Sequence, residues 1–430
     1  MHELFKYIVT AILTFEAKIL LRRKRPKIIG ITGSVGKTTT KDAIFTVLKN
    51  EVHVRKSEKS FNSNIGVTLT ILGLQNGWNS PWLWLRNIVD GAFQALFATD
   101  YPDVLILELG VDRPGDMKTL TKFIKPDIVV LTRLPDMPSH VEFFSSPEEV
   151  REEKLTLVKS LKVDGVFIYN NDDERIRQYV EEVRQPSFGY SRYSQSHFQA
   201  SGDRILYDGG FASGIEFNVS HLEEKVKVAL QGALGVQHAY NVVAAMAVGS
   251  QFGITLEQSA KSFDNFKPVP GRMRLVNGRN KTLLIDDTYN SSPVAAERAL
   301  QTLDELKTPK RKVVILGDML ELGQFSVREH QHVGSLVAEV ADVLITVGLR
   351  SRKTAISALE HGLSEKCVFQ YENIEKLIAE IDSLIEPEDT VLVKGSQSIR
   401  AERVVKALMA NPEKAPELLV RQDNAWLRRA

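Results

Sequence analysis

The stretch KIIGITGSVGKTTT, residues 27–40, decides the fold of this chain. Its first six residues form the apolar, β-branched run of a buried strand, and an amphipathic run, DAIFTVLKN (residues 42–50), follows the loop. Glycines between strand and helix let backbone N–H groups turn inward around phosphate oxygens, where the positive end of the helix dipole adds attraction. The order strand, glycine loop, helix therefore predicts a phosphate-binding loop.

The loop is a variant of the general motif G-x-x-x-x-G-K, because Ile31 stands where the motif has its first glycine. Gly33 supplies the flexibility instead. We expect Lys37 to reach the outer phosphates of ATP, and the Thr38 or Thr39 hydroxyl to bind Mg²⁺. The alternative is a chance Gly-Lys-Thr in an ordinary turn. The predicted nucleotide-binding residues of the loop are Gly33, Ser34, Val35, Gly36, Lys37, Thr38 and Thr39.

A Mg²⁺ site also needs a carboxylate at the end of a neighbouring strand. Glu108 ends the apolar run VLILE, residues 104–108, and is the candidate ligand. The alternative is a carboxylate that only caps the turn after the strand.

Similar apolar runs recur along the chain with helical spacers between them, which predicts parallel sheets covered on both faces. Residues 198–233 alternate and carry turn residues, which favours an antiparallel patch, and KPVPGR (residues 267–272) is typical of a linker. We expect an α/β protein: a short N-terminal helix (1–26), a P-loop parallel-sheet ATPase domain (27–268) and a Rossmann-like C-terminal domain (269–430). The predicted strands are residues 27–32, 104–108, 128–132, 165–169, 313–317, 343–347 and 390–394.

Composition excludes several classes of protein. Of the 430 residues, 43% are hydrophobic and 25% charged, as in a soluble globular chain. The formal net charge of +1 argues against a nucleic-acid binder. Cys367 is the only cysteine, so neither an intramolecular disulfide nor a multi-cysteine zinc site is expected, and a cytoplasmic location is predicted.

The N-terminus is apolar from residue 4 to residue 21 and then reads RRKR, residues 22–25. Lys6, Glu16 and Lys18 leave only residues 7–15 uncharged, well short of the ~20 that a membrane span needs. A signal peptide would place its charges before the apolar run. Two interpretations stay open: a helix packed on the domain, or an interfacial helix attracted to anionic lipid.

The run TGSVGKTTTK, residues 32–41, resembles the phosphate loop of the Mur ligase family, the ATP-dependent amide ligases of peptidoglycan precursor synthesis. The resemblance extends from about residue 27 to residue 405 and is strongest to the branch that joins D-alanyl-D-alanine to a UDP-N-acetylmuramoyl tripeptide. Its further motifs, in order, are FNSNIGVTLT (61–70), LELG (107–110), IDDTYNSSP (285–293), GDMLELG (317–323) and VKGS (393–396).

The resemblance also implies roles for single residues. Catalysis is assigned to Lys37, His140, Lys154 and Arg272, which with Mg²⁺ offset the repulsion between a carboxylate and the triphosphate. Lys154 falls on the lysine that is carbamylated in many members, although its surroundings in sequence equally fit an exposed helical lysine. Arg272 falls on the arginine that contacts the γ-phosphate. The implied metal ligands are Thr38, Glu108, His140 and Lys154, and the implied nucleotide contacts beyond the loop are His238, Asn241, Arg272, Asp287, Tyr289 and Asn290.

The chain departs from the family pattern at several places. Only 26 residues precede Lys27, too few for the UDP-binding domain expected there. Arg133 and Gln397 replace a usual asparagine and arginine. Extra sequence at residues 75–101 holds three of the four tryptophans. One interpretation is an added helix that packs on the domain. The other is a membrane-facing surface, formed by residues 76–100 together with residues 1–25, that makes peripheral contact with the inner face of the membrane.

Two functional alternatives accompany the ligase prediction. One is a Mur-type ligase that acts on another small-molecule carboxylate, such as an amino-acid, polyglutamate or lipid-linked substrate. The other is a nucleotide-switched membrane scaffold that hydrolyses ATP slowly and ligates nothing. For the ligases we expect small-molecule substrates, ATP and Mg²⁺, and no nucleic acid.

Overall fold

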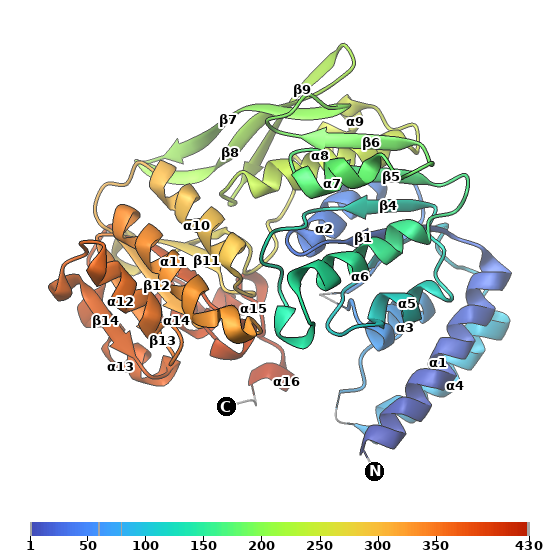
Figure 1. Cartoon of the computed structure of the whole chain (residues 1–430), viewed down its shortest axis with the longest axis horizontal. Coiled ribbons are helices and arrows are strands. Elements are labelled where there is room, and N and C mark those ends of the chain that lie inside the picture. Colours follow the sequence, from blue (N-terminus) through green and yellow to red (C-terminus); the bar gives the residue numbers. More distant parts are fainter. Residues whose placement is uncertain (1, 59–60, 79, 428–430) are drawn as a thin grey trace. The chain divides into compact units, whose positions relative to one another are not determined.

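The structure is a computed structural model that describes residues 2–58, 61–78 and 80–427. The chain forms two compact units, shown in Figure 1. Three of the ranges assigned above contain residues that lie outside the described ones. These are Met1 in the N-terminal helix, Asn79 in the added segment and residues 428–430 in the C-terminal domain. The first unit comprises Met1–Ser201, Val219–Val226 and Tyr240–Phe263, and the second Gly202–Asn218, Lys227–Ala239 and Asp264–Ala430.

The first sheet has the strand order β2-β3-β1-β4-β5-β6-β7-β8-β9. Neighbours from β2 to β7 are parallel. Two-residue connections join β7 to β8 and β8 to β9, and such short connections allow only antiparallel pairing. The strands are β1 Lys27–Thr32, β2 Val54–Lys56, β3 Val104–Glu108, β4 Ile128–Leu131, β5 Val166–Asn170, β6 Ser187–Ser191, β7 Phe198–Asp208, β8 Phe211–His221 and β9 Glu224–Gln231.

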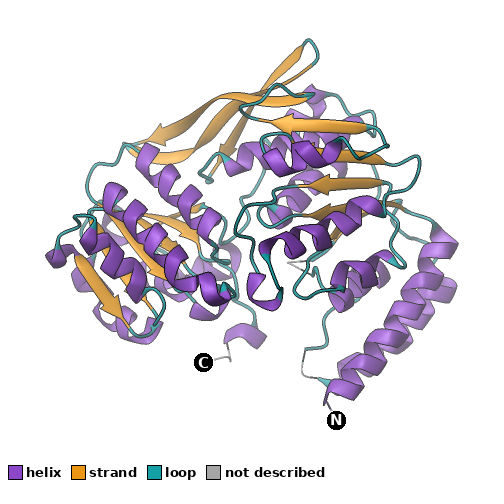
Figure 2. Ribbon diagram, in the orientation of Figure 1, coloured by secondary structure: helices purple, strands orange, loops and turns teal. Residues whose placement is uncertain are grey.

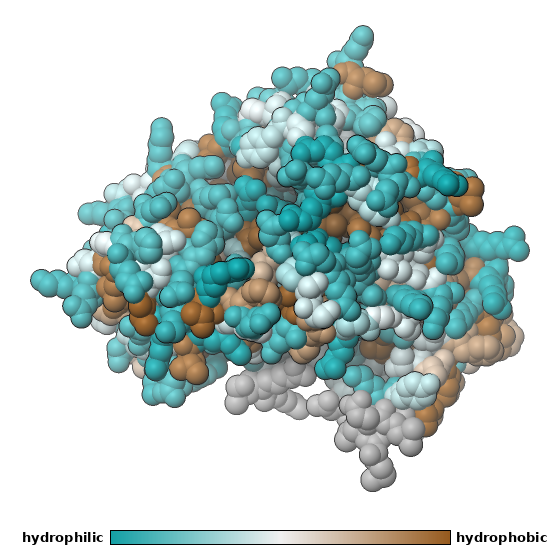
Figure 3. Space-filling view, in the orientation of Figure 1, coloured by the Kyte–Doolittle hydropathy of each residue, from teal (hydrophilic) through white to brown (hydrophobic). Residues whose placement is uncertain are grey.

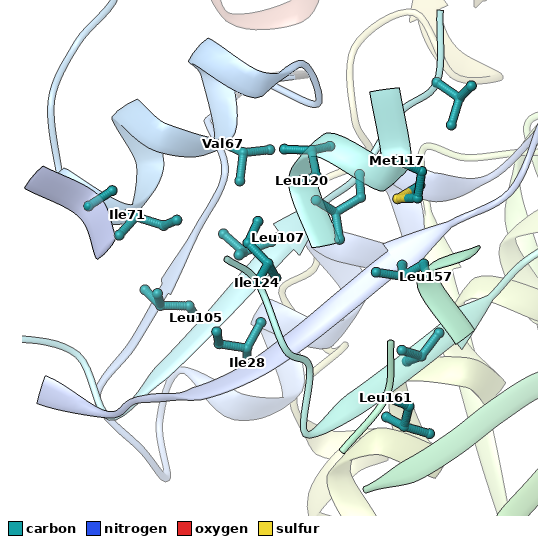
Figure 4. Close-up of a cluster of buried hydrophobic side chains, with 14 of the residues drawn as sticks. Ile28, Val67, Ile71, Leu105, Leu107, Met117, Leu120, Ile124, Leu157 and Leu161 are labelled. Carbon is teal, nitrogen blue, oxygen red and sulfur yellow. The ribbon is translucent and has the colours of Figure 1, made fainter. Parts of the chain in front are cut away.

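Helices cover both faces of the parallel part of this sheet (Figure 2). Alternate side chains of the strands, such as Ile28, Leu105 and Leu107, point to one face and pack with α3, α5 and α6 in a single apolar cluster (Figure 4). Helix α2 packs against β1, β2 and β3. The helices up to residue 261 are α1 His2–Lys24, α2 Lys37–Leu48, α3 Asn64–Leu72, α4 Pro81–Phe97, α5 Asp116–Thr121, α6 Pro147–Lys159, α7 Glu174–Val180, α8 Gln237–Ser250 and α9 Leu256–Lys261.

The second sheet has the order β10-β11-β15-β12-β13-β14. Only the β10–β11 pair is antiparallel among these described strands. Its strands are β10 Arg274–Asn277, β11 Leu283–Asp287, β12 Lys312–Gly317, β13 Val343–Val347, β14 Val368–Tyr371 and β15 Thr390–Lys394. The accompanying helices are α10 Pro293–Glu305, α11 Ser326–Val340, α12 Arg352–Glu360, α13 Ile374–Leu384, α14 Glu402–Leu408, α15 Ala415–Leu418 and α16 Asn424–Leu427.

The predicted α/β architecture is confirmed. All seven predicted strands are present with ends within one residue of the prediction, and residues 198–231 form the expected antiparallel strands. The sequence prediction missed β2, β6, β10, β11 and β14. Except for β11, these strands are short or only partly buried, so they lack the continuous apolar run that marks a central parallel strand.

Helices α1 and α4 lie side by side at one edge of the first unit (Figure 1). Val9, Leu13, Ala17 and Leu20 form a stripe at helical spacing that is buried against the unit. One face of α1 is therefore packed on the domain, as one of the two interpretations expected. Among the described helices, none combines the length and apolar character that a membrane crossing requires.

A carboxyl group lies in the contact between these two helices. Glu16 on α1 is only 7% exposed, and its Oε2 accepts no hydrogen bond from any described residue. A Cβ atom added to Gly91 of α4 would stand 2.2 Å from that oxygen, so the glycine leaves room for the carboxyl group in its present position. Burial raises the pKa of Glu16 from 4.5 to about 7.

Glu16→Gln should therefore change how stability depends on pH. The folded protein holds the Glu16 proton more tightly than the unfolded chain, so stability is lost as pH rises from about 4.5 through about 7. At pH 8 the free energy of unfolding of the variant should exceed that of the wild type by up to about 2–3 kcal/mol, and at pH 4 the two values should differ little. Urea unfolding at both pH values measures the difference. Glu51→Gln, at an exposed position of the same unit, is the control, and equal effects of the two changes would contradict the assignment.

Candidate nucleotide-binding site

The phosphate loop joins β1 to α2 where the sheet order reverses direction, because β1 lies between β3 and β4. Ligands of open parallel sheets bind at the carboxyl ends of the strands at such a point. Gly33 (φ 139°) and Gly36 (φ 90°) adopt backbone angles that other residues rarely reach. At Gly33 there is also no room, since an added Cβ would lie 2.0 Å from Thr132 Oγ1. The loop thus requires both glycines, and it leads directly into the N-terminus of α2, where the first N–H groups have no acceptor within the helix.

Glu108 stands at the end of β3, the strand beside the loop, and is almost fully buried. Thr38 Oγ1 donates to Glu108 Oε1 over 3.2 Å, and Lys41 Nζ lies 3.6 Å from Glu108 Oε2. Thr38 and Lys41 are three residues apart on α2, so they share the helix face that meets the strand. The structure therefore brings the predicted hydroxyl and carboxylate together.

These two groups fit a magnesium ion. Mg²⁺ prefers oxygen ligands and usually takes only one or two from protein, the rest coming from phosphates and water. Glu108 Oε2 accepts no hydrogen bond from a described residue, which leaves an acceptor beside Thr38. The described residues contain no group of three or more His, Cys, Asp or Glu side chains that could hold a metal without such outside ligands.

Lys154 is 2% exposed on α6, so it is not an ordinary surface lysine. Burial, with a smaller contribution from the positive charge of Lys37, lowers the pKa of its amine to about 7. Asp112 and Glu153 oppose that shift. Near neutral pH, a large share of Lys154 is therefore the uncharged amine.

His140 follows β4 in a loop and adopts a left-handed backbone (φ 67°). Its Nε2 lies 3.7 Å from Asp112 Oδ1. Because Asp112 also acts on the pKa of Lys154, the two predicted metal-binding side chains share an acidic neighbour that sequence reasoning did not select.

Asn241 is buried on α8 beside the phosphate loop. Its Oδ1 accepts from Thr40 Oγ1 over 2.9 Å, and a Cβ added to Gly36 would lie 3.3 Å from the same oxygen. The side chain therefore supports the end of the loop in this structure.

In the second unit, Arg272 lies over the ring of Tyr289, with its guanidinium carbon 4.0 Å from the ring centroid. Arg272 Nε is buried and donates no hydrogen bond to a described residue. The Nε2 of His238 lies 3.2 Å from the Arg272 carbonyl oxygen. Burial lowers the pKa of His238 to about 4, so its imidazole is neutral at pH 7 and its Nε2–H donates this bond.

Asp287, at the end of β11, pairs with Lys394 at the end of β15, with Nζ and Oδ2 2.5 Å apart. Lys394 Nζ also donates to the Asn290 carbonyl over 3.0 Å. The other Asp287 oxygen accepts from Met273 N at 3.2 Å. These bonds fasten the segment that holds Tyr289 and Asn290 to the segment that holds Arg272, so the predicted residues of this unit form one cluster.

Sequence reasoning missed Lys41, Asp112 and Lys394 as members of these clusters. Lys394 stood in the quoted run VKGS at the end of an apolar strand, and that position was a usable signal. Lys41 could have been found from its three-residue spacing to Thr38. Asp112 gave no signal, since only the folded loops bring it to His140.

Comparison with protein families settles the class of this fold. The Mur ligase middle domain matches residues 31–249, half of the chain, and the Mur ligase glutamate ligase domain matches residues 271–397. The chain belongs to the Mur ligase family. The predicted resemblance is thereby confirmed, and the two matches fall in the order in which the phosphate loop and the IDDTYN segment occur.

Individual Mur ligases align over most of the chain. The UDP-N-acetylmuramoyl-tripeptide–D-alanyl-D-alanine ligase of Bacillus subtilis is 28% identical over 397 residues, covering 92% of this chain and 79% of the relative. The enzyme of the same name from Escherichia coli is 28% identical, with 90% and 77% covered.

Solved structures support the fold. The MurF ligase of Thermotoga maritima, in complex with ADP, superposes with a TM-score of 0.76 at 24% identity, covering 94% of this chain and 84% of that one. The folylpolyglutamate synthase of Mycobacterium tuberculosis, also with ADP, gives 0.64 at 17% identity, with 93% and 94% covered.

Lys37→Ala should abolish ATP-dependent ligation, by at least about 100-fold, because a positioned charge on the transferred phosphoryl group is lost. In the structure Lys37 Nζ donates to the Gly33 carbonyl over 2.8 Å, so the side chain already lies along the loop. Phosphate release and nucleotide binding are the measurements. The exposed Lys49→Ala, at the other end of α2, is the control, and near-normal turnover of Lys37→Ala would refute the assignment.

Proposed function

We propose that this Mur ligase is an ATP-dependent amide ligase that adds D-alanyl-D-alanine to a UDP-N-acetylmuramoyl tripeptide. The observation that carries the proposal is the 28% identity to a curated ligase of that activity over 92% of the chain. The phosphate loop, with Thr38 held on Glu108, supports it.

The reaction proceeds in two steps. A carboxylate oxygen of the acceptor attacks the γ-phosphorus of ATP, and the bond to the bridging oxygen breaks to give an acyl phosphate and ADP. The amine of the dipeptide then attacks the acyl carbon, loses a proton and expels phosphate. Activation is needed because a carboxylate does not react with an amine.

Charge neutralisation is the main demand of the first step, since two anions must meet. Lys37 meets that demand in the loop, and Arg272, with its buried Nε lacking a described partner, is suited to an anionic oxygen. Thr38 and Glu108 would hold Mg²⁺, which when bound neutralises phosphate charge and orients the γ-phosphate.

We propose in addition that Lys154 is carbamylated. The uncharged amine attacks CO2, a proton leaves, and the product is a carbamate anion. Burial favours this step because it keeps a large part of Lys154 uncharged near neutral pH. The carbamate turns this buried amine into an anion that can serve as an oxygen ligand for a second metal ion.

Ligase activity should therefore depend on CO2. Enzyme equilibrated in CO2-free buffer should lose activity and regain it with bicarbonate, whereas Lys154→Ala should be at least about 100-fold less active and give no response. The exposed Lys159→Ala on the same helix should behave as wild type. Carbon-labelled CO2 followed by NMR reports the carbamate directly, and full activity of Lys154→Ala would contradict the role.

Omitting each substrate in turn tests the reaction itself. With UDP-muramoyl tripeptide, D-alanyl-D-alanine and ATP together we expect multiple-turnover phosphate release, and omission of either peptide should reduce it to a background. Phosphate release that needs neither peptide would favour the scaffold alternative. Phosphate release stimulated by another carboxylate, such as a glutamyl or lipid-linked acceptor, would support the ligase reaction and contradict the proposed substrate.

We also propose that the enzyme works in the cytoplasm at the inner face of the membrane, through peripheral contact of residues 1–25 and 76–100. In the described part of these ranges, α1 exposes large apolar side chains from Phe5 to Phe15, and α4 exposes them from Trp82 to Phe97.

A further inference from the structure

The outer side of the α1–α4 pair is an apolar surface. Of the 22 large hydrophobic side chains exposed among the described residues, 12 lie on these two helices. On α1 they follow the stripe Phe5, Ile8, Ile12 and Phe15, which lies beside the buried stripe of the same helix. The others are Tyr7 on α1 and Trp82, Leu83, Leu85, Val89, Phe93, Leu96 and Phe97 on α4.

The surface is one continuous feature because the helices are fixed side by side and run in the same direction. Leu13 and Glu16 meet Gly91, and one turn or two further along, Arg23 donates to the carbonyls of Leu96 and Ala98. Figure 3 shows part of this surface as the brown side chains at the lower right, over the pair. Exposed apolar side chains on a monomer are usually scattered singly, so a contiguous group of them marks an interaction site.

The two segments that form the surface carry a net positive charge. Residues 5–25 and 81–97 contain seven basic and two acidic residues, a formal charge of +5, whereas the whole chain has +1 and the remainder therefore −4. Of the two acids, Glu16 is buried and Asp90 pairs with Arg86. The basic residues gather at the end of α1, where Arg22 and Arg25 are exposed.

We propose that the α1–α4 surface docks on a bilayer that contains anionic phospholipid, the apolar stripes entering the headgroup–acyl boundary and the basic cluster meeting the lipid phosphates. The inference rests on the peripheral contact proposed above and names its partner. An apolar face bordered by Lys and Arg, with Trp and Tyr at its edge, is the pattern of an interfacial helix.

Charge decides between a bilayer and a second copy of this chain. In a symmetric dimer the same surface would face itself, so two +5 segments would be brought together. An anionic bilayer instead cancels that charge.

Vesicle sedimentation of the full chain tests the proposal. Binding to phosphatidylcholine vesicles that contain phosphatidylglycerol should exceed binding to phosphatidylcholine alone, and should fall sharply at about 1 M salt, where screening is nearly complete. Tryptophan emission should shift to shorter wavelength on binding, since Trp82 is 73% exposed in the free protein.

Two double variants separate the contributions. Arg22→Gln/Arg25→Gln should weaken binding to anionic vesicles by about 20-fold, near fivefold for each charge. Trp82→Ser/Phe93→Ser should weaken binding to all vesicles by at least about tenfold. The matched controls, which alter exposed residues elsewhere, are Arg184→Gln/Lys225→Gln and Val163→Ser/Leu222→Ser.

Phosphate release is measured for every variant in the absence of vesicles, and it reports whether the protein is folded and the ligase site is intact. Normal ligase activity with no binding to any vesicle, or binding that the variants leave unchanged, would overturn the docking proposal and leave the proposed reaction standing. A dimer in light scattering that Trp82→Ser/Phe93→Ser dissolves would overturn it in favour of a second copy. Vesicle binding in a chain that ligates nothing would refute the reaction alone.

Discussion

The left-handed turn at Gly33 and Gly36 is the constraint on which the first unit's site depends. It lets β1 end against β3 and β4 while α2 begins within the same few residues, so that loop amides, the Thr38 hydroxyl and the Glu108 carboxylate meet at one edge of the sheet. The room at Gly33 is already filled by Thr132, so a larger residue would displace the neighbouring strand end or the loop. Fold and chemistry are inseparable at this position.

The buried carboxylate of Glu108 is compensated by two side chains of α2. A carboxylate removed from water is costly unless it is paired, and Lys41 and Thr38 provide the pairing here. A metal ion and a triphosphate would bring charges of both signs to the same place. Lys41 thus offsets the charge of Glu108, while Lys37 lies along the loop within reach of Gly33.

The second unit builds its cluster differently. Asp287 and Lys394 come from the ends of adjacent parallel strands, and their ion pair anchors the loop of Tyr289 and Asn290. Neighbouring Asp286, whose pKa burial raises to about 6, accepts from Gly271 N and Thr288 and ties the Arg272 segment to the same strand. The cluster is therefore anchored on the pair of strand ends, and the backbone on either side of Arg272 is held by hydrogen bonds from Gly271 N to Asp286 and from Met273 N to Asp287.

The sequence by itself determined the phosphate loop, the central strands and the α/β class, because these depend on local patterns: apolar runs, glycines and helical spacing. It also placed the family's residues in order. Only the tertiary structure decided that Lys154 is buried rather than exposed, that Asp112 lies beside His140 and acts on the pKa of Lys154, and that Lys41 pairs with Glu108. Burial and pairing across distant segments depend on how sheets and loops pack, and no local pattern encodes them. For the same reason the sequence left open whether the N-terminal helix packs on the domain, and the burial of Leu13 and Ala17 shows that one face of it does.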